Sequence, residues 1–201
     1  MKAIQFCRIG ILAAAVAAAS CGSTVREGSG TSFLIVDRLE FAPGYEPEQF
    51  VGNLLSDVIT VVDDVPTFFN DLARVTFRLG LKDPGTATNP NTPTQNQSIT
   101  VDRYSVRFFR TDGRNTPGVD VPYPFDGAFT ATVSGATATA ASFTVVRHDA
   151  KLEAPLRALT NNLLILSAIV EVTFYGHDQT GREVTATARS SVEFGNFGDP
   201  D

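Results

Sequence analysis

The stretch Ile169–Phe194 constrains the fold more than any other part of the chain. Val170, Val172 and Phe174 alternate with polar residues, and a second alternation follows the polar segment HDQTGRE. This second alternation puts on one face Val184, Ala186, Ala188, Val192 and Phe194. Successive side chains of a strand point to opposite faces, so the pattern predicts two half-buried antiparallel strands. Gly181 supplies the positive φ that the turn between them needs.

Alternation of the same kind predicts strands in most of the preceding chain, and no segment keeps a helical period of 3.6. The predicted strands are Ser32–Phe41, Leu54–Val62, Asp71–Lys82, Ser98–Arg110, Gly127–Val133 and Ser142–Val146. One short helical turn is expected within Arg147–Asn162, and the low-complexity stretch Asp83–Gln97 is expected to be an exposed loop. We therefore predict an all-β chain, folded as a single antiparallel sandwich of two sheets with about eight strands.

Composition is that of a globular protein and argues against one class of partner. Apolar residues make up 43% of the 201 residues and charged residues 19%. Without the leader proposed below, which contains Lys2 and Arg8, 14 basic residues face 22 acidic ones, a net charge of −8. Such a surface repels phosphate backbones, so nucleic acid is not an expected partner.

The N-terminal segment has the organisation of an export signal. Lys2 and Arg8 form a positive region, and Ile9–Ala19 is an apolar run too short to span a bilayer. Small residues then lead directly to a cysteine, in the order Ala18-Ala19-Ser20-Cys21. We predict a signal peptide over residues 1–20, a flexible Gly/Ser-rich tether over 21–31 and the β domain over 32–201.

The end of this leader resembles the lipobox of bacterial lipoprotein precursors, with Ala18 where leucine is more usual. The resemblance implies that Cys21 is lipidated and becomes the mature N-terminus. Gly22, rather than Asp, then implies passage to the outer membrane of the bacterial envelope. The alternative is an ordinary secretory signal that is cleaved near a cysteine. Cys7 lies in the leader, so Cys21 is the one remaining thiol and no intramolecular disulfide is expected.

The C-terminal hairpin resembles the last two strands of immunoglobulin-like or fibronectin-type bacterial domains. The resemblance rests on Tyr175, the turn Asp178–Gly181 and the Thr/Val-rich stretch Glu183–Ala188. It implies an immunoglobulin-like sandwich. Taken whole, the chain resembles bacterial lipoproteins, and this resemblance implies no particular activity.

Two groups of residues are candidates for metal chemistry. His148 and His177 are each followed by an aspartate, and together they would serve a metal-dependent hydrolase if their loops converged. Two solvated loop histidines are the simpler interpretation. The segment Thr111–Asp126 carries calcium-type oxygen ligands in Asp112, Asn115, Asp120 and Asp126. Their spacing is not that of an EF-hand, and Asp and Asn favour turns without any ion.

The same segment is the best candidate for a binding surface. Arg114, Tyr123 and Phe125 are its candidate contact residues, although Tyr123-Pro124-Phe125 would equally suit a cap over the open end of the sandwich. The leading hypothesis is a lipid-anchored, non-enzymatic module that binds or scaffolds another envelope protein or polymer and needs no cofactor. The alternatives are a calcium-binding adhesive or structural domain, and the hydrolase.

Overall fold

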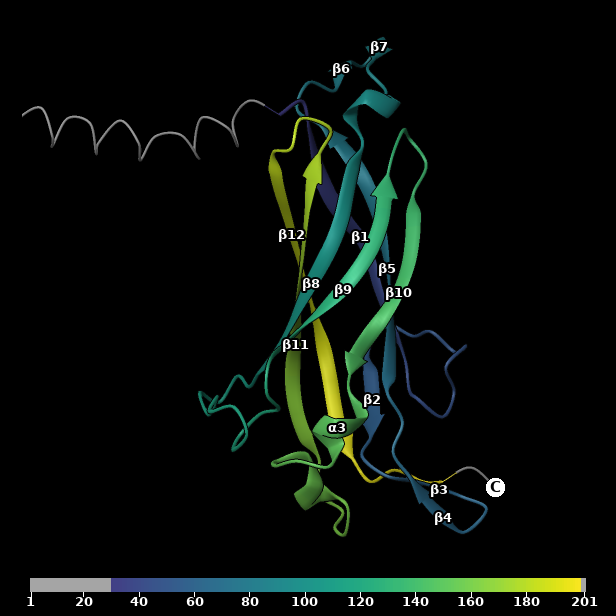
Figure 1. The fold of residues 1–201 in the computed structure, drawn as a ribbon, viewed down its shortest axis with the longest axis vertical. Coiled ribbons are helices and arrows are strands. Elements are labelled where there is room, and N and C mark those ends of the chain that lie inside the picture. The colour runs from purple at the N-terminus through teal and green to yellow at the C-terminus, as the bar shows by residue number, and fades with distance from the viewer. Residues whose placement is uncertain (1–29, 200–201) are drawn as a thin grey trace, which may run out of the picture.

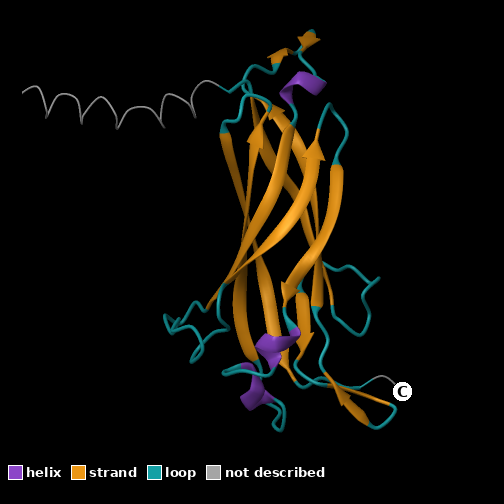
Figure 2. Ribbon diagram, viewed as in Figure 1, coloured by secondary structure: helices purple, strands orange, loops and turns teal. Residues whose placement is uncertain are grey.

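Strands dominate the part of the chain that the computed structural model describes, residues 30–199 (Figures 1 and 2). The long strands are β1 (Ser32–Ala42), β5 (Asp71–Leu81), β8 (Ile99–Phe109), β9 (Phe125–Val133), β10 (Thr139–Val146), β11 (Leu166–Asp178) and β12 (Glu183–Gly195). The short ones are β2 (Leu54–Asp57), β3 (Thr60–Val62), β4 (Val65–Thr67), β6 (Gly85–Thr86) and β7 (Asn89–Pro90). The helical segments are η1 (Gln95–Gln97), α3 (His148–Lys151) and η2 (Leu156–Leu159). The prediction of an all-β chain is confirmed.

Within these residues the strands form two larger sheets and two small hairpins. One sheet has the order β1-β5-β10, and the other has the order β2-β12-β11-β8-β9. Every pairing is antiparallel except that of β2 with β12, which is parallel and departs from the purely antiparallel prediction. The predicted strand Leu54–Val62 is divided, so that β2 joins the five-stranded sheet and β3 pairs with β4 instead.

The predicted apolar faces of the long strands form the core. Val170, Val172 and Phe174 of β11 are fully buried, and the polar partners in the alternation point away from the core. Gly181 turns the β11–β12 hairpin with a φ of 77°, as predicted. Rings from the two larger sheets meet edge to face at the centre: Phe77 of β5 lies 4.9 Å from Phe174, between ring centroids. Edge-to-face contacts between rings stabilise the fold beyond the hydrophobic free energy gained by burying their surface.

The first strand shows where alternation alone misleads. Phe33 and Phe41 fall in the same phase of the sequence pattern, yet Phe33 is exposed, whereas Leu34 and Phe41 are buried. The pairing of β1 with β5 slips between Val36 and Arg38, which marks a β-bulge. A bulge adds one residue to one strand, so the side chains on its two sides occupy opposite phases.

A buried ion pair ties the two sheets together at one end of the molecule. Lys151 of α3 is 1% exposed and Asp71 at the start of β5 is fully buried, with Nζ and Oδ1 3.0 Å apart. Asp71 also accepts hydrogen bonds from the Gly44 N–H at 2.9 Å and from the Ser56 hydroxyl at 2.6 Å. Because Ser56 belongs to β2, this carboxylate joins the three-stranded sheet, the five-stranded sheet and the helix.

Candidate binding site

The loop of residues 110–124 joins β8 to β9 and projects from the side of the molecule (Figure 1). Its own polar side chains hold its turns. Asn115 Oδ1 accepts a hydrogen bond from the backbone N–H of Arg110 at 2.6 Å. Asp120 Oδ2 accepts one from the backbone N–H of Thr116 at 3.1 Å. Asx side chains of this kind replace backbone partners in tight turns, so these oxygens have a structural use.

The candidate calcium ligands are not gathered around a common point. Asp112 lies between two guanidinium groups, 2.6 Å from Nη2 of Arg110 and 2.9 Å from Nη2 of Arg114. Hydrogen bonds from Arg110, and then from Arg114, hold the pKa of Asp112 below its usual range. Asp126 belongs to β9 and faces Arg103 at 3.9 Å. Within residues 30–199, no three His, Cys, Asp or Glu side chains are arranged to hold a metal ion.

The two histidines lie at opposite ends of the molecule. His148 begins α3 at the lower end in Figure 1, where its Nδ1 is 3.2 Å from Asn70 Oδ1. His177 is near the upper end of β11, with its Nδ1 3.2 Å from Asp102 Oδ2. The shared metal site that a hydrolase would need is therefore not formed by this pair.

A cross-strand triplet of charges occupies the outer face of the five-stranded sheet. Glu171 of β11 is paired in register with Arg107 of β8 on one side and with Arg189 of β12 on the other. Arg107 donates Nε–H and Nη2–H to Glu171 Oε1 at 3.1 and 2.6 Å. Arg189 places Nε and Nη2 at 2.7 and 2.6 Å from Oε2. Opposite charges directly across neighbouring strands stabilise a sheet, and this carboxylate has two such partners.

Glu171 is only 7% exposed, whereas the arginine side chains that cover it are 64% and 63% exposed. Burial raises the pKa of Glu171, but the hydrogen bonds from Arg189 and Arg107 outweigh it and leave the pKa below its usual value. The carboxylate is thus ionised at neutral pH. It holds two guanidinium groups in fixed orientations at the surface.

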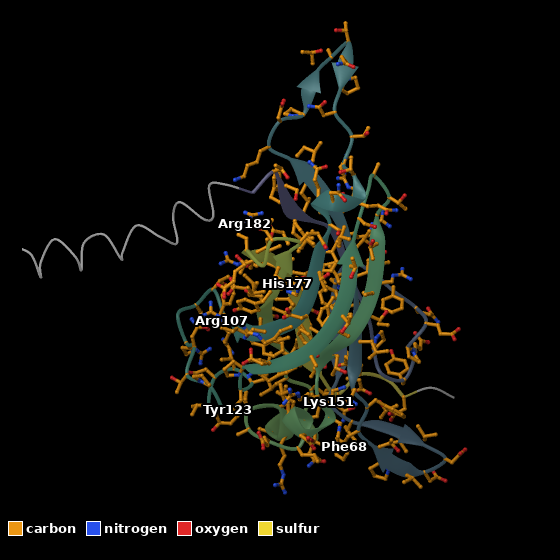
Figure 3. All side chains as sticks on the ribbon, turned by 45° about the horizontal axis from the view of Figure 1, so that its top comes forward. Phe68, Arg107, Tyr123, Lys151, His177 and Arg182 are labelled. Atoms are coloured by element: carbon orange, nitrogen blue, oxygen red, sulfur yellow. The ribbon has the colours of Figure 1, made fainter. Side chains whose placement is uncertain are left out.

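The two arginines of the triplet and the loop border an open hollow of about 510 Å³, which we call the Arg107–Arg189 hollow. The sheet contributes Arg107, Phe108, Phe109 and Arg189, and the loop contributes Asn115, Pro117, Pro122 and Pro124. The Arg189 guanidinium lies over the Phe109 ring, 5.4 Å from its centroid. Proline has no N–H to donate, so the loop presents a largely apolar wall to the two cationic groups. Figure 3 shows Arg107 on the side from which the loop projects.

The three candidate contact residues of the loop and its flank have different roles. Arg114 is exposed but pairs with Asp112. Tyr123 is 56% exposed and borders a second hollow, of about 750 Å³, against residues 152–158. Phe125 is half-buried beneath the Arg147 guanidinium, 3.9 Å from its ring centroid, and its edge meets Tyr104. Tyr123 is therefore placed to contact a partner, whereas Phe125 covers the core.

Sequence reasoning missed the triplet. Arg107 and Glu171 occupy outward-facing positions of two predicted strands, but nothing in a single chain tells which strands are neighbours or in what register. The available signal was one outward-facing charged residue on each of three strands, positive on two of them and negative on the third. Cys21, the predicted lipidation site, lies outside the residues that the structure describes.

Comparison with protein-family models, with curated proteins and with solved structures yields no match to this chain. Between residues 30 and 199, no helix is long and apolar enough to cross a membrane.

Proposed function

We propose that this protein is a lipid-anchored bacterial envelope protein whose β domain binds another envelope component without catalysing a reaction. The support for the anchor is the leader, in which a positive region and an apolar run end at Ala18-Ala19-Ser20-Cys21. Two or more acyl chains on Cys21 would give stable membrane attachment. Gly22 favours delivery to the outer membrane.

We further propose that the domain is an immunoglobulin-like sandwich. Two sheets of three and five strands share one aromatic core, with Phe77 of one sheet against Phe129 and Phe174 of the other. Loops between strands of a rigid scaffold are common binding elements in such domains. The parallel pairing of β2 distinguishes this chain from a simple antiparallel arrangement.

The observation that carries the binding function is the Arg107–Arg189 hollow. Its cationic groups are fixed by an ionised, buried glutamate, and its wall comes from a loop held in shape by Asn115 and Asp120. Fixed donors beside an apolar wall favour recognition, because little conformational entropy is lost when a partner binds.

Two experiments test the proposal. Replacing Cys21 by Ala should release the protein from the membrane fraction into the soluble fraction, and continued sedimentation with membranes would contradict the lipid anchor. Crosslinked pull-down of the intact protein from membranes should then identify an envelope component. That component should be lost when the triplet is neutralised together as Arg107→Gln, Glu171→Gln and Arg189→Gln.

Arg103→Gln is the matched control for the pull-down. Arg103 lies on the same outer face and stacks on Tyr175 at 4.0 Å, outside the hollow. Its replacement should leave capture unchanged. Equal capture by the wild type and the neutralised triplet would contradict binding at the hollow.

A further inference from the structure

The two arginines of the hollow have donors left over after they have paired with Glu171. A guanidinium carries five N–H groups, and Glu171 engages the Nε and Nη2 positions of both side chains. Among residues 30–199, no acceptor meets the Nη1 group of Arg107 or of Arg189. The Nη1–Nη2 edge of each guanidinium is therefore open to an oxyanion, which arginine binds in a two-pronged geometry.

The charge of the triplet limits which oxyanion fits. Two guanidinium groups and one ionised carboxylate leave a single excess positive charge. A monoanion balances this charge. A dianion such as a phosphate monoester would bring a second negative charge close to Glu171, whose own charge is poorly screened because it is buried.

The other residues that line the hollow limit the kind of molecule to which the anionic group can belong. Pro117, Pro122 and Pro124 line the hollow together with Phe109, and Asn115 is the one amide side chain among the lining residues. Asn115 is already engaged with the Arg110 backbone through both Oδ1 and Nδ2. A sugar ring would find few partners here for its hydroxyl groups, whereas an apolar side chain would bury its surface against proline and phenylalanine.

We propose that the Arg107–Arg189 hollow binds a peptide carboxylate that adjoins an apolar side chain, such as the C-terminus of a protein partner. This inference rests on the proposed binding function and names the chemistry of the partner. The carboxylate would take the free edges of the two guanidinium groups, and the apolar side chain would lie against the prolines.

The test is a titration of the full-length protein in detergent micelles with N-acetyl-phenylalanine. Binding should be saturable by calorimetry and should shift the NMR signals of the Arg107 and Arg189 Nε–H groups. The neutral amide of the same compound should not bind, because it lacks the charge. N-acetylglycine, which lacks the apolar side chain, should bind more weakly.

Two further probes separate the possible sources of the anion. Glucuronate represents an acidic sugar and phenyl phosphate represents a phosphate monoester, and each should bind more weakly than N-acetyl-phenylalanine. Tighter binding of either compound would overturn the assignment to a peptide carboxylate. Equal binding of N-acetyl-phenylalanine and its amide would overturn the role of the arginines.

Variants locate the site. Arg189→Gln should weaken binding of N-acetyl-phenylalanine about tenfold or more, since hydrogen bonds to charged groups contribute most to such contacts. Arg103→Gln should leave the dissociation constant unchanged. Asn115→Asp keeps the acceptor for the Arg110 N–H and adds a negative charge to the hollow, so it should weaken binding without removing an arginine. Unchanged binding in Asn115→Asp and Arg189→Gln would contradict the proposal.

The titration and the pull-down together distinguish failure of the carboxylate inference from failure of the proposed binding function. If N-acetyl-phenylalanine does not bind but the pull-down still depends on the triplet, the hollow is a binding site for a different chemistry. If N-acetyl-phenylalanine binds at the hollow but the captured component is indifferent to the triplet, the carboxylate site stands and the envelope partner docks elsewhere.

Discussion

The buried pair Lys151–Asp71 gives the sharpest prediction about stability. Both side chains are almost wholly removed from solvent, and Nζ and Oδ1 are 3.0 Å apart. Replacing Lys151 by Met keeps most of the apolar stem but leaves the Asp71 carboxylate buried without its counter-charge. Loss of one partner of a buried pair costs about 3–5 kcal/mol in free energy of unfolding. For a domain of this size, that corresponds to a fall in Tm on the order of 10 °C.

The matching double variant separates loss of the pair from loss of packing. When Asp71→Asn is combined with Lys151→Met no charge remains. The amide oxygen at position 71 can still accept the Gly44 N–H, and the amide NH2, in the place of Oδ2, can donate to the Ser56 hydroxyl, which is able to accept as well as donate. The double variant should recover most of the stability that either single change loses, because neutral replacement of a buried pair is often tolerated. The assay is chemical denaturation of the two single variants and the double variant, combined in a double-mutant cycle.

The pH dependence of the single variant provides a second test. Burial raises the pKa of Asp71, while the charge of Lys151 and the hydrogen bonds from Ser56, Lys151 and Gly44 act against it. For an acid with a raised pKa in the folded state, stability is greatest below the pKa of the unfolded state, about 3.9 for Asp, and falls as pH rises through the folded value. The deficit of Lys151→Met should therefore shrink on acidification. A single variant that loses less than about 1 kcal/mol at neutral pH, as exposed pairs do, would refute the reasoning.

Three other predictions concern the turn and the core. Burial raises the pKa of Asp178, but hydrogen bonds from Thr180 and Arg182 lower it by more, so its contribution to stability should decrease steadily as pH falls below about 4, the pKa of an unfolded Asp. Asp178→Asn should flatten the curve of Tm against pH between about 5 and 2. Phe174→Ala should cost about 3–5 kcal/mol by denaturation because this fully buried ring contacts both sheets, and a cost no larger than that of the exposed control Phe33→Ala would argue against the core. Gly176→Ala would make the added Cβ clash with the Thr100 carbonyl oxygen of the neighbouring strand, so Tm should fall. An unchanged Tm would show that β8 and β11 do not approach each other this closely.

Alternation was sufficient to predict the seven long strands but not the short ones, nor which strands are neighbours. The buried faces of β5, β11 and β12 follow directly from apolar residues at every second position, because half-buried strands impose that period. In β8 the buried phase changes once, at the register shift between Val101 and Arg103. The phase of β1 could not be predicted, since the bulge at Asp37 has no sequence signature of its own. The parallel pairing of β2 is equally hidden, because Leu54–Asp57 is too short to show a pattern.

The pairing of buried polar residues could not be predicted from the sequence. The sequence pattern places Lys151 in a short helical turn and Asp71 at the start of a strand. Nothing near either residue in the sequence indicates that the two side chains meet, 80 positions apart. The candidate site shows the same limit. The loop of residues 110–124 stood out by its own composition, whereas the triplet that completes the hollow requires the register of three strands.

Site-specific photocrosslinking in intact membranes tests the central claim most directly. A photoreactive residue at Thr187, which is exposed on β12 two residues from Arg189, should form an adduct with an envelope protein. The same residue at Thr86, exposed on the β6–β7 hairpin, should form none. An adduct from Thr187 that disappears when the triplet is neutralised is the result we predict. An adduct that forms from Thr86 alone, or that forms equally in the neutralised variant, would contradict the account.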